Sequence, residues 1–267
     1  MSASLVGSEM CIRDRTSGSP GRLIILFAIP LMLGNICQQL YTMVDTMVVG
    51  QVVGVEALAA LGAVDFLMWV VTGISTGLTQ GFSIQLSQYY GAKDFENLRK
   101  SLAHSYRLTA FIAAGVLILS QSFASLVLTG LHTPSNIIGM SLLYLRIIFC
   151  GIPATAAYNM FASALRAMGN SKTPLTAMII ASVLNVSLDI LFVAGFGWGV
   201  AGAAIATVIA QSFSAVYCFL ILRRIDIVHL TRADFMPASG MNARLMKLGI
   251  PVVFQNIITV SYTHLRA

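Results

Sequence analysis

The chain contains few charged residues. Asp, Glu, Lys and Arg make up 10% of its 267 residues, whereas a soluble domain carries about a quarter. This scarcity excludes an ordinary water-soluble enzyme. The hydrophobic share of 57% also excludes an intrinsically disordered chain, because apolar surface for burial is plentiful. A polytopic membrane protein remains, and we expect an all-α fold in which each long apolar stretch spans the bilayer.

The signatures of catalysis and of metal or cofactor binding are also missing. The four cysteines form no CxxC pair, and the four histidines show no HExxH spacing. One GxSxG match occurs, GISTG at Gly73–Gly77, but it lies inside a long apolar block and not at a strand-to-helix turn. We therefore expect neither an enzyme nor a resident cofactor. The net charge of +6 does not predict a nucleic-acid partner, because the basic residues are not interleaved with aromatic ones. They are typical of the cytoplasmic loops of membrane proteins.

Long apolar blocks predict six transmembrane helices and the start of a seventh. Each block is long enough for a helix of about 20 residues and has few charged interruptions. The blocks cover about Leu23–Val49, Ala57–Leu86, Leu102–Leu128, Ile137–Leu165, Pro174–Phe196, Trp198–Leu222 and Leu245 onward.

The connections between these blocks differ sharply in Lys and Arg content. Eleven of the sixteen Lys and Arg residues fall just before the first block, in every second connection or at the start of the seventh block: Arg22, Lys93, Arg99, Lys100, Arg166, Lys172, Arg223, Arg224, Arg232, Arg244 and Lys247. The alternate connections, at 51–56, 129–136 and 195–197, contain none. Cytoplasmic loops are enriched in these residues. We therefore expect a multi-pass protein of the cytoplasmic membrane with a cytoplasmic N-terminus.

Two short segments, FAIPLMLGNI at Phe27–Ile36 and LGIPVVFQNI at Leu248–Ile257, resemble each other. An even number of predicted helices separates them, so they share an orientation, as in the parallel repeats of some transporters. The predicted organisation is a six-helix lobe at 20–222, an inter-lobe loop at 223–244 and the start of helix seven at 245–260. Residues 1–19 are expected to be a non-native or disordered leader, and 261–267 a non-native tail.

Acidic residues inside the apolar blocks are the strongest functional signal. Asp45 and Asp189 lie toward the outer ends of the first and fifth predicted spans. A carboxylate within the membrane is costly and marks an ion or proton path by default. Asp65 in the second block is better explained as an interfacial residue.

Polar residues form stripes around these two carboxylates. On the first span Asn35, Gln38, Tyr41, Thr42 and Asp45 fall within an arc of about 120° at helical periodicity. Ser182, Asn185 and Asp189 share a face of the fifth span, and Thr207, Gln211 and Ser214 share one of the sixth. Because lipid cannot solvate these groups, we expect the stripes to face one another. Polar contacts that only hold helices together are the alternative, and they explain two carboxylates poorly.

The predicted chemistry is cation coordination. Two carboxylates with amide and hydroxyl oxygens form a hard-oxygen set suited to Na⁺ or to proton exchange. A second feature is the GxxxGxxxG stripe of Gly73, Gly77 and Gly81, which predicts close approach of another helix.

Taken in order, several segments resemble the multidrug and toxic compound extrusion (MATE) family. They are the IP…VDTMVVG pattern ending at Gly50, QLSQYYGAKD at 85–94, LRAMGNSKTP at 165–174, NVSLD at 185–189 and GVAGAAIATVIAQ at 199–211. The resemblance implies twelve helices in two pseudo-symmetric lobes, of which this chain holds the first. It also implies export of small organic, usually cationic, drugs or xenobiotics in exchange for H⁺ or Na⁺.

The resemblance places the cation site at Asp45, Asn185, Asp189 and Thr207. The substrate cavity then contains Asn35, Gln38, Tyr41, Thr42 and Gln211. Membrane lipid is the expected surrounding, and a monomer the expected state. Two alternatives stay open: an inactive half-transporter fragment, and a flippase or exporter of lipid-linked oligosaccharide or polysaccharide. The flippase is favoured only by Arg146 within the fourth block.

Overall fold

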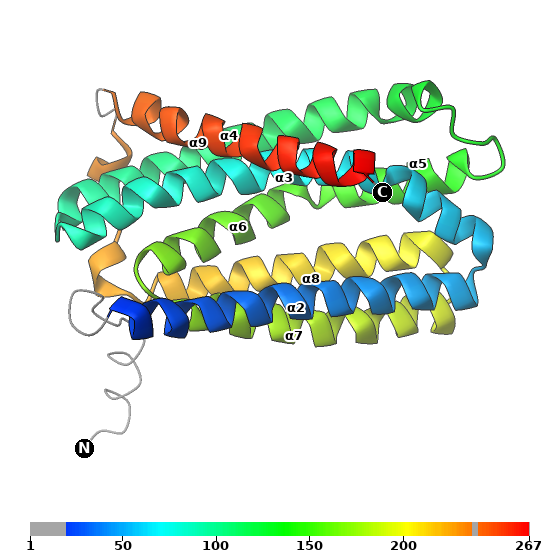
Figure 1. Cartoon of the computed structure of the whole chain (residues 1–267), viewed down its shortest axis with the longest axis horizontal. Coiled ribbons are helices and arrows are strands. Elements are labelled where there is room, and N and C mark those ends of the chain that lie inside the picture. Colours follow the sequence, from blue (N-terminus) through cyan, green and yellow to red (C-terminus); the bar gives the residue numbers. More distant parts are fainter. Residues whose placement is uncertain (1–19, 237–239, 267) are drawn as a thin grey trace, which may run out of the picture.

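The computed structural model describes residues 20–236 and 240–266. Over these residues the chain is almost entirely helical and contains no strand (Figure 1). The α-helices are α2 (Pro20–Val52), α3 (Val55–Gly91), α4 (Phe95–Gly130), α5 (Ile138–Cys150), α6 (Ile152–Ala167), α7 (Lys172–Asp189), α8 (Gly199–Leu222) and α9 (Met241–Arg266). Three short segments complete the fold: a π-helix, η1 (Ile190–Gly195), and two 3₁₀ turns, η2 (Asp226–Val228) and η3 (Arg232–Phe235).

The all-α membrane fold expected from composition is confirmed. Within the described residues, four helical stretches are long and apolar enough to cross a bilayer: α3, α4, α7 continued by η1, and α8. The bent pair α5–α6 makes a fifth if it counts as one span. α2 has 33 residues, and α9 contains the predicted start of helix seven. The number of six spans in the first lobe stays a prediction.

The helices form two layers with α6 between them (Figure 1). One layer contains α2, α7 and α8, and the other contains α3, α4 and α9. α6 contacts α3 and α4 on one side and α8 on the other. A shared apolar core links the layers through fully buried side chains such as Phe82 of α3, Leu165 of α6 and Leu222 of α8.

The fourth predicted span, expected to be one helix, is broken. α5 and α6 meet at Gly151 with a bend of 45°. Pro153 follows the break, and proline removes a backbone donor while its ring collides with the carbonyl four residues earlier. Gly151 also sits tightly against α8, since a Cβ added there would lie 2.7 Å from Cγ2 of Val208. The bend thus combines a lost hydrogen bond with a close helix contact.

The fifth predicted span changes its helical form at Asp189. α7 ends there, and the chain continues as the π-helix η1. The turn is closed by wide hydrogen bonds, such as Phe196 N–H to the Leu191 carbonyl at 2.9 Å. Gly202 of α8 makes room for this wide turn, because a Cβ there would lie 3.0 Å from Cβ of Phe192.

α9 lies along α3, and glycines make this packing possible (Figure 1). An added Cβ on Gly77 would lie 2.7 Å from Cα of Val253, and one on Gly81 would overlap the backbone of Gly249. The predicted close approach is therefore present at two of the three glycines. Gly73 has nothing within 4 Å of such a Cβ, because the contact with α9 does not reach it.

The predicted domain boundaries remain predictions. The expected leader at 1–19 lies outside the described residues. The segment between α8 and α9 contains η2 and η3, and α9 begins at Met241, four residues before the predicted start. At the other end, α9 continues through Arg266, and the expected non-native tail at 261–267 stays a prediction.

Candidate cation and substrate site

The two intramembrane carboxylates are buried. Asp45 on α2 is 6% exposed, and Asp189, the last residue of α7, is 0% exposed. The two carboxyl groups lie close enough to interact electrostatically. Asp65, in contrast, is exposed on α3, which agrees with its interpretation as a residue at the membrane interface. Two of the three acidic residues in the apolar blocks thus lie together inside the protein.

Amide and hydroxyl groups of α7 and α8 lie beside them. Asn185 stands one turn before Asp189 and is 1% exposed. Its Nδ2 donates to Oγ1 of Thr207 on α8 at 3.5 Å. Gln211 lies one turn further along α8, and its side chain interacts with the hydroxyl of Tyr41 on α2. These contacts bring the three polar stripes of α2, α7 and α8 into one place.

A small pocket lies at this meeting point. Its polar lining comes from Tyr41 of α2, Asn185 of α7 and Thr207, Gln211 and Ser214 of α8. The pocket has a volume of about 10 Å³, near the lower limit for a single water molecule. Its lining includes neither Asp45 nor Asp189, and its size allows one water or a dehydrated cation and excludes a drug-sized molecule.

Several buried oxygens around this point lack a hydrogen-bond partner within the described part of the chain. They are both carboxylate oxygens of Asp189, Oδ1 of Asp45, Oδ1 of Asn185 and Oε1 of Gln211. Burying such groups without partners is costly, above all when they are charged. All five are acceptors, so a cation, a proton or a donating water can satisfy them. Over the same residues no three His, Cys, Asp or Glu side chains cluster, as a transition-metal site would require.

The predicted substrate-cavity residues are only partly brought together. Tyr41 and Gln211 lie in the small pocket, whereas Gln38 and Thr42 are exposed on α2. Asn35 is also exposed and borders a separate pocket with Arg166 and Ser171 near the start of α7. The helical wheel of α2 places Asn35, Gln38, Tyr41 and Thr42 on one face but does not give their positions along the helix axis: Asn35 stands six residues, or about 9 Å, from Tyr41.

Two features of the site were not predicted from the sequence. Tyr144 on α5 is 6% exposed and interacts electrostatically with Asp45 and Asp189. A tyrosine in an apolar block has no spacing signature, so nothing in the sequence marked it. The π-helix that begins directly after Asp189 is the second. Such wide turns occur often at functional sites, but no residue pattern in 190–195 announces one.

Comparison with known proteins places the chain in a family. A sequence profile of the MatE family matches residues 30–191, which is more than half of the chain. The chain belongs to the MatE family. The matched region includes α3 to α6 and both buried carboxylates.

Among curated MatE relatives, a probable multidrug resistance protein of Bacillus subtilis, YpnP, is 31% identical over 92% of this chain and 55% of its own length. A second from the same organism, YoeA, is 29% identical over 95% of this chain and 56% of its own. The structure of a multidrug resistance MATE transporter in an outward-facing conformation superposes with a TM-score of 0.84 at 26% identity. The superposed region covers 90% of this chain and 53% of the chain of that transporter. The chain thus spans about half the length of the relatives it matches.

Proposed function

We propose that this chain supplies the N-terminal lobe of a cation-coupled antiporter. The antiporter exports organic cations, drugs or other xenobiotics across the cytoplasmic membrane by alternating access. H⁺ or Na⁺ enters from outside and binds at Asp45, Asn185, Asp189 and Thr207. The N-terminus lies on the cytoplasmic side, as the distribution of Lys and Arg indicates, and the working unit is a monomer surrounded by lipid.

One observation carries this proposal. Two buried carboxyl groups lie within range of electrostatic interaction, and three of their four oxygens have no hydrogen-bond partner in the described residues. A rigid structural ion pair would supply a basic partner, and neither residue takes part in an ion pair within the described part of the chain. The arrangement instead supports a site that gains and loses a small cation.

Coupling follows if the cation binds the two conformations with different affinity. A ligand shifts a conformational equilibrium only by its differential affinity for the two states. Asp189 stands where the α-helix gives way to η1, so a change in helical form there alters the position of its carboxylate relative to Asp45. Cation binding would then favour the conformation in which the ligands are closest together.

The substrate is proposed to bind outside this small pocket. A pocket of about 10 Å³ cannot hold a drug, whereas ligand pockets for such molecules measure about 300–1,000 Å³. Asn35, Gln38 and Thr42 lie exposed on α2, where a second lobe would complete a larger cavity. Their neutral polar side chains suit cationic substrates better than a basic wall would.

The test is dye efflux in a protein that carries this sequence together with a second half of the family length. Asp45→Asn and Asp189→Asn should each abolish coupled efflux while leaving membrane insertion unchanged, because the amide cannot take up a cation or a proton as the carboxylate does. Asp65→Asn, an exposed residue on the neighbouring helix, is the matched control. Efflux that persists in both site variants at the level of the control would overturn the site assignment.

The second candidate, a flippase for lipid-linked saccharide, is favoured by one observation. Arg146 is exposed beside an apolar groove of α4 and α5, where a basic side chain could meet a lipid phosphate. Translocation of a labelled lipid headgroup in proteoliposomes, without dye transport, would support the flippase and contradict the exporter.

A further inference from the structure

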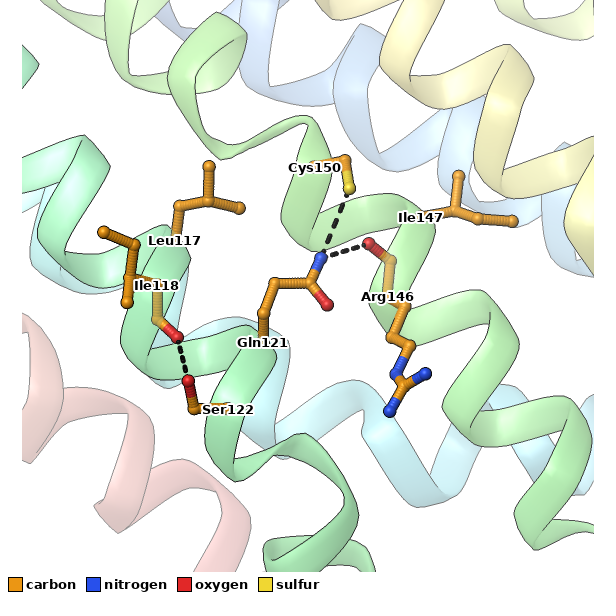
Figure 2. A pocket seen from close by; sticks show the side chains of 7 residues that line it. All are labelled: Leu117, Ile118, Gln121, Ser122, Arg146, Ile147 and Cys150. Atoms are coloured by element: carbon orange, nitrogen blue, oxygen red, sulfur yellow. Dashed lines mark hydrogen bonds between the residues drawn. The ribbon is translucent and has the colours of Figure 1, made fainter.

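A groove of about 610 Å³ lies between α4 and α5 (Figure 2). It shares no lining residue with the small pocket of the cation site. Its walls are apolar, with Leu117 and Ile118 from α4 and Ile147 from α5. Its one charged lining residue is Arg146, whose side chain is exposed. The groove therefore combines a long apolar wall with a single positive charge.

Gln121 is fixed across this groove. Its Nε2 donates to the backbone carbonyl of Arg146 at 2.8 Å and to Sγ of Cys150 at 3.2 Å. The Arg146 guanidinium takes no part in these bonds. Figure 2 shows its side chain extending away from Cys150, toward the end of α4 and α5 that residues 131–137 connect. This is the direction in which helical side chains tilt, toward the helix N-terminus.

The guanidinium has no acidic partner in the described residues. The ion pairs there are Lys100–Glu96 and His229–Asp226. Asp65 of α3 lies at about the same depth in the membrane as Arg146. The Ser141 hydroxyl of α5 donates to the Ala60 carbonyl of α3 at 3.2 Å, which places these two residues side by side. Asp65 follows Ala60 by five residues, and Arg146 follows Ser141 by five. The two nevertheless form no ion pair. An arginine stays charged in any protein environment, so an anion from outside the chain is the missing counter-charge.

The depth of the groove fits a lipid headgroup. Arg107 near the other end of α4 donates to the Phe235 carbonyl at 2.9 Å and marks the polar boundary on that side. Gln121 follows fourteen residues later, about 21 Å along the helix. The hydrocarbon core is about 30 Å thick, so Gln121 lies about 9 Å inside the opposite boundary. A long arginine side chain reaches from such a depth toward the headgroups.

We propose that this groove binds one anionic membrane phospholipid. Its phosphate pairs with the Arg146 guanidinium, which can donate two parallel hydrogen bonds to phosphate oxygens. The first part of an acyl chain lies along Leu117, Ile118 and Ile147. The groove volume is within the range of small-molecule sites and accommodates this portion of the lipid. The proposed lipid site requires only that α4 and α5 span the membrane, and it does not rest on the transport function proposed above.

The test measures lipids retained by the purified 267-residue chain. The protein is exchanged into detergent with equal amounts of phosphatidylglycerol and phosphatidylcholine, and the bound lipids are counted by native mass spectrometry. Arg146→Gln should lower phosphatidylglycerol retention about tenfold, as expected for one lost charge-assisted hydrogen-bonded pair. Arg224→Gln, which removes an exposed arginine after α8, is the charge-matched control and should leave retention unchanged.

A second variant, Arg146→Lys, keeps the positive charge and so distinguishes loss of the lipid contact from loss of the fold. It should retain an intermediate amount of phosphatidylglycerol, because an ammonium group offers a point charge in place of the planar fork. Size-exclusion chromatography checks that each variant is folded. Equal retention by the unchanged chain and Arg146→Gln would refute the site, and so would equal losses in Arg146→Gln and Arg224→Gln. Displacement of the lipid by millimolar inorganic phosphate would assign the groove to a soluble anion and also refute the proposal.

Discussion

The seam between α3 and α9 allows a comparison of three glycines on one helix. Gly73, Gly77 and Gly81 follow one another at four-residue intervals on α3. Replacing each by alanine adds the same methyl group to the same helix. Only its surroundings differ: open space at Gly73, the Val253 backbone at Gly77 and the Gly249 backbone at Gly81.

The expected effects have opposite signs. In Gly73→Ala the methyl meets nothing within 4 Å, and alanine stabilises a helix relative to glycine by about 0.5–1 kcal/mol. In Gly77→Ala it would lie 2.7 Å from Cα of Val253, and overpacking of this kind costs about 1–3 kcal/mol. Because the obstacle at Gly77 and at Gly81 is backbone, it cannot move aside as a side chain does. We therefore expect a net loss of up to about 2 kcal/mol in both variants, after the gain in helix propensity is subtracted.

Thermal unfolding in detergent measures these differences. A change of 1 kcal/mol shifts Tm by about 2–4 °C in a protein of this size class. Gly77→Ala and Gly81→Ala should unfold several degrees below the unchanged chain, and Gly73→Ala at the same temperature or slightly above. If Gly81→Ala is as stable as Gly73→Ala, then α9 does not pack against α3 as described.

Two further predictions concern the polar ends of the helices. Asp94 caps α4, accepting from Asn97 N–H at 3.1 Å and from Asn97 Nδ2 at 2.7 Å, and these hydrogen bonds hold the pKa of its carboxyl below the ordinary value. The Asp94 carboxylate therefore stabilises the fold at pH values above its pKa in the unfolded chain, and this stabilisation is lost as the pH falls through its lower pKa in the folded chain. In Asp94→Asn, Tm should depend less on pH when it is measured between pH 7 and 3. His104 is 2% exposed and lies 2.7 Å from Oδ1 of Asn242 and 3.1 Å from the Met236 carbonyl. His104→Leu should destabilise this junction by about 1–3 kcal/mol and speed tryptic cleavage after Arg232, and an unchanged cleavage rate would contradict a supporting role for the histidine.

Apolar block length and period were enough to predict where the helices lie. Each predicted block overlaps a helix of the structure, because in lipid an apolar stretch must satisfy its own backbone hydrogen bonds. The departures occur where backbone geometry depends on a neighbouring helix. The bend at Gly151 needs the contact with Val208, and η1 needs the space beside Gly202. Neither contact can be read from local sequence.

The same limit applies to the candidate site. Carboxylates inside apolar blocks indicated Asp45 and Asp189, since few alternatives explain a buried acid in a membrane. Helical periodicity put Asn185 on the face of Asp189 and Thr207 on the face of Gln211. It also put Gln38 and Thr42 on the face of Asp45, but these two are exposed, because a helical wheel does not show which other helices cover that face. Tyr144 joins the site from α5 only through tertiary packing.

The meeting of Gly81 with Gly249 has a mechanical consequence. Here two helix backbones touch, but the side chains of Leu78 and Phe82 flank Gly249 and that of Val253 packs against Gly77, so these side chains must repack when one helix slides along the other. Sliding of packed helices by small steps is a common form of conformational change. The backbone contact at Gly81 thus holds α3 and α9 close together, and the side chains beside it limit motion along their length to small steps.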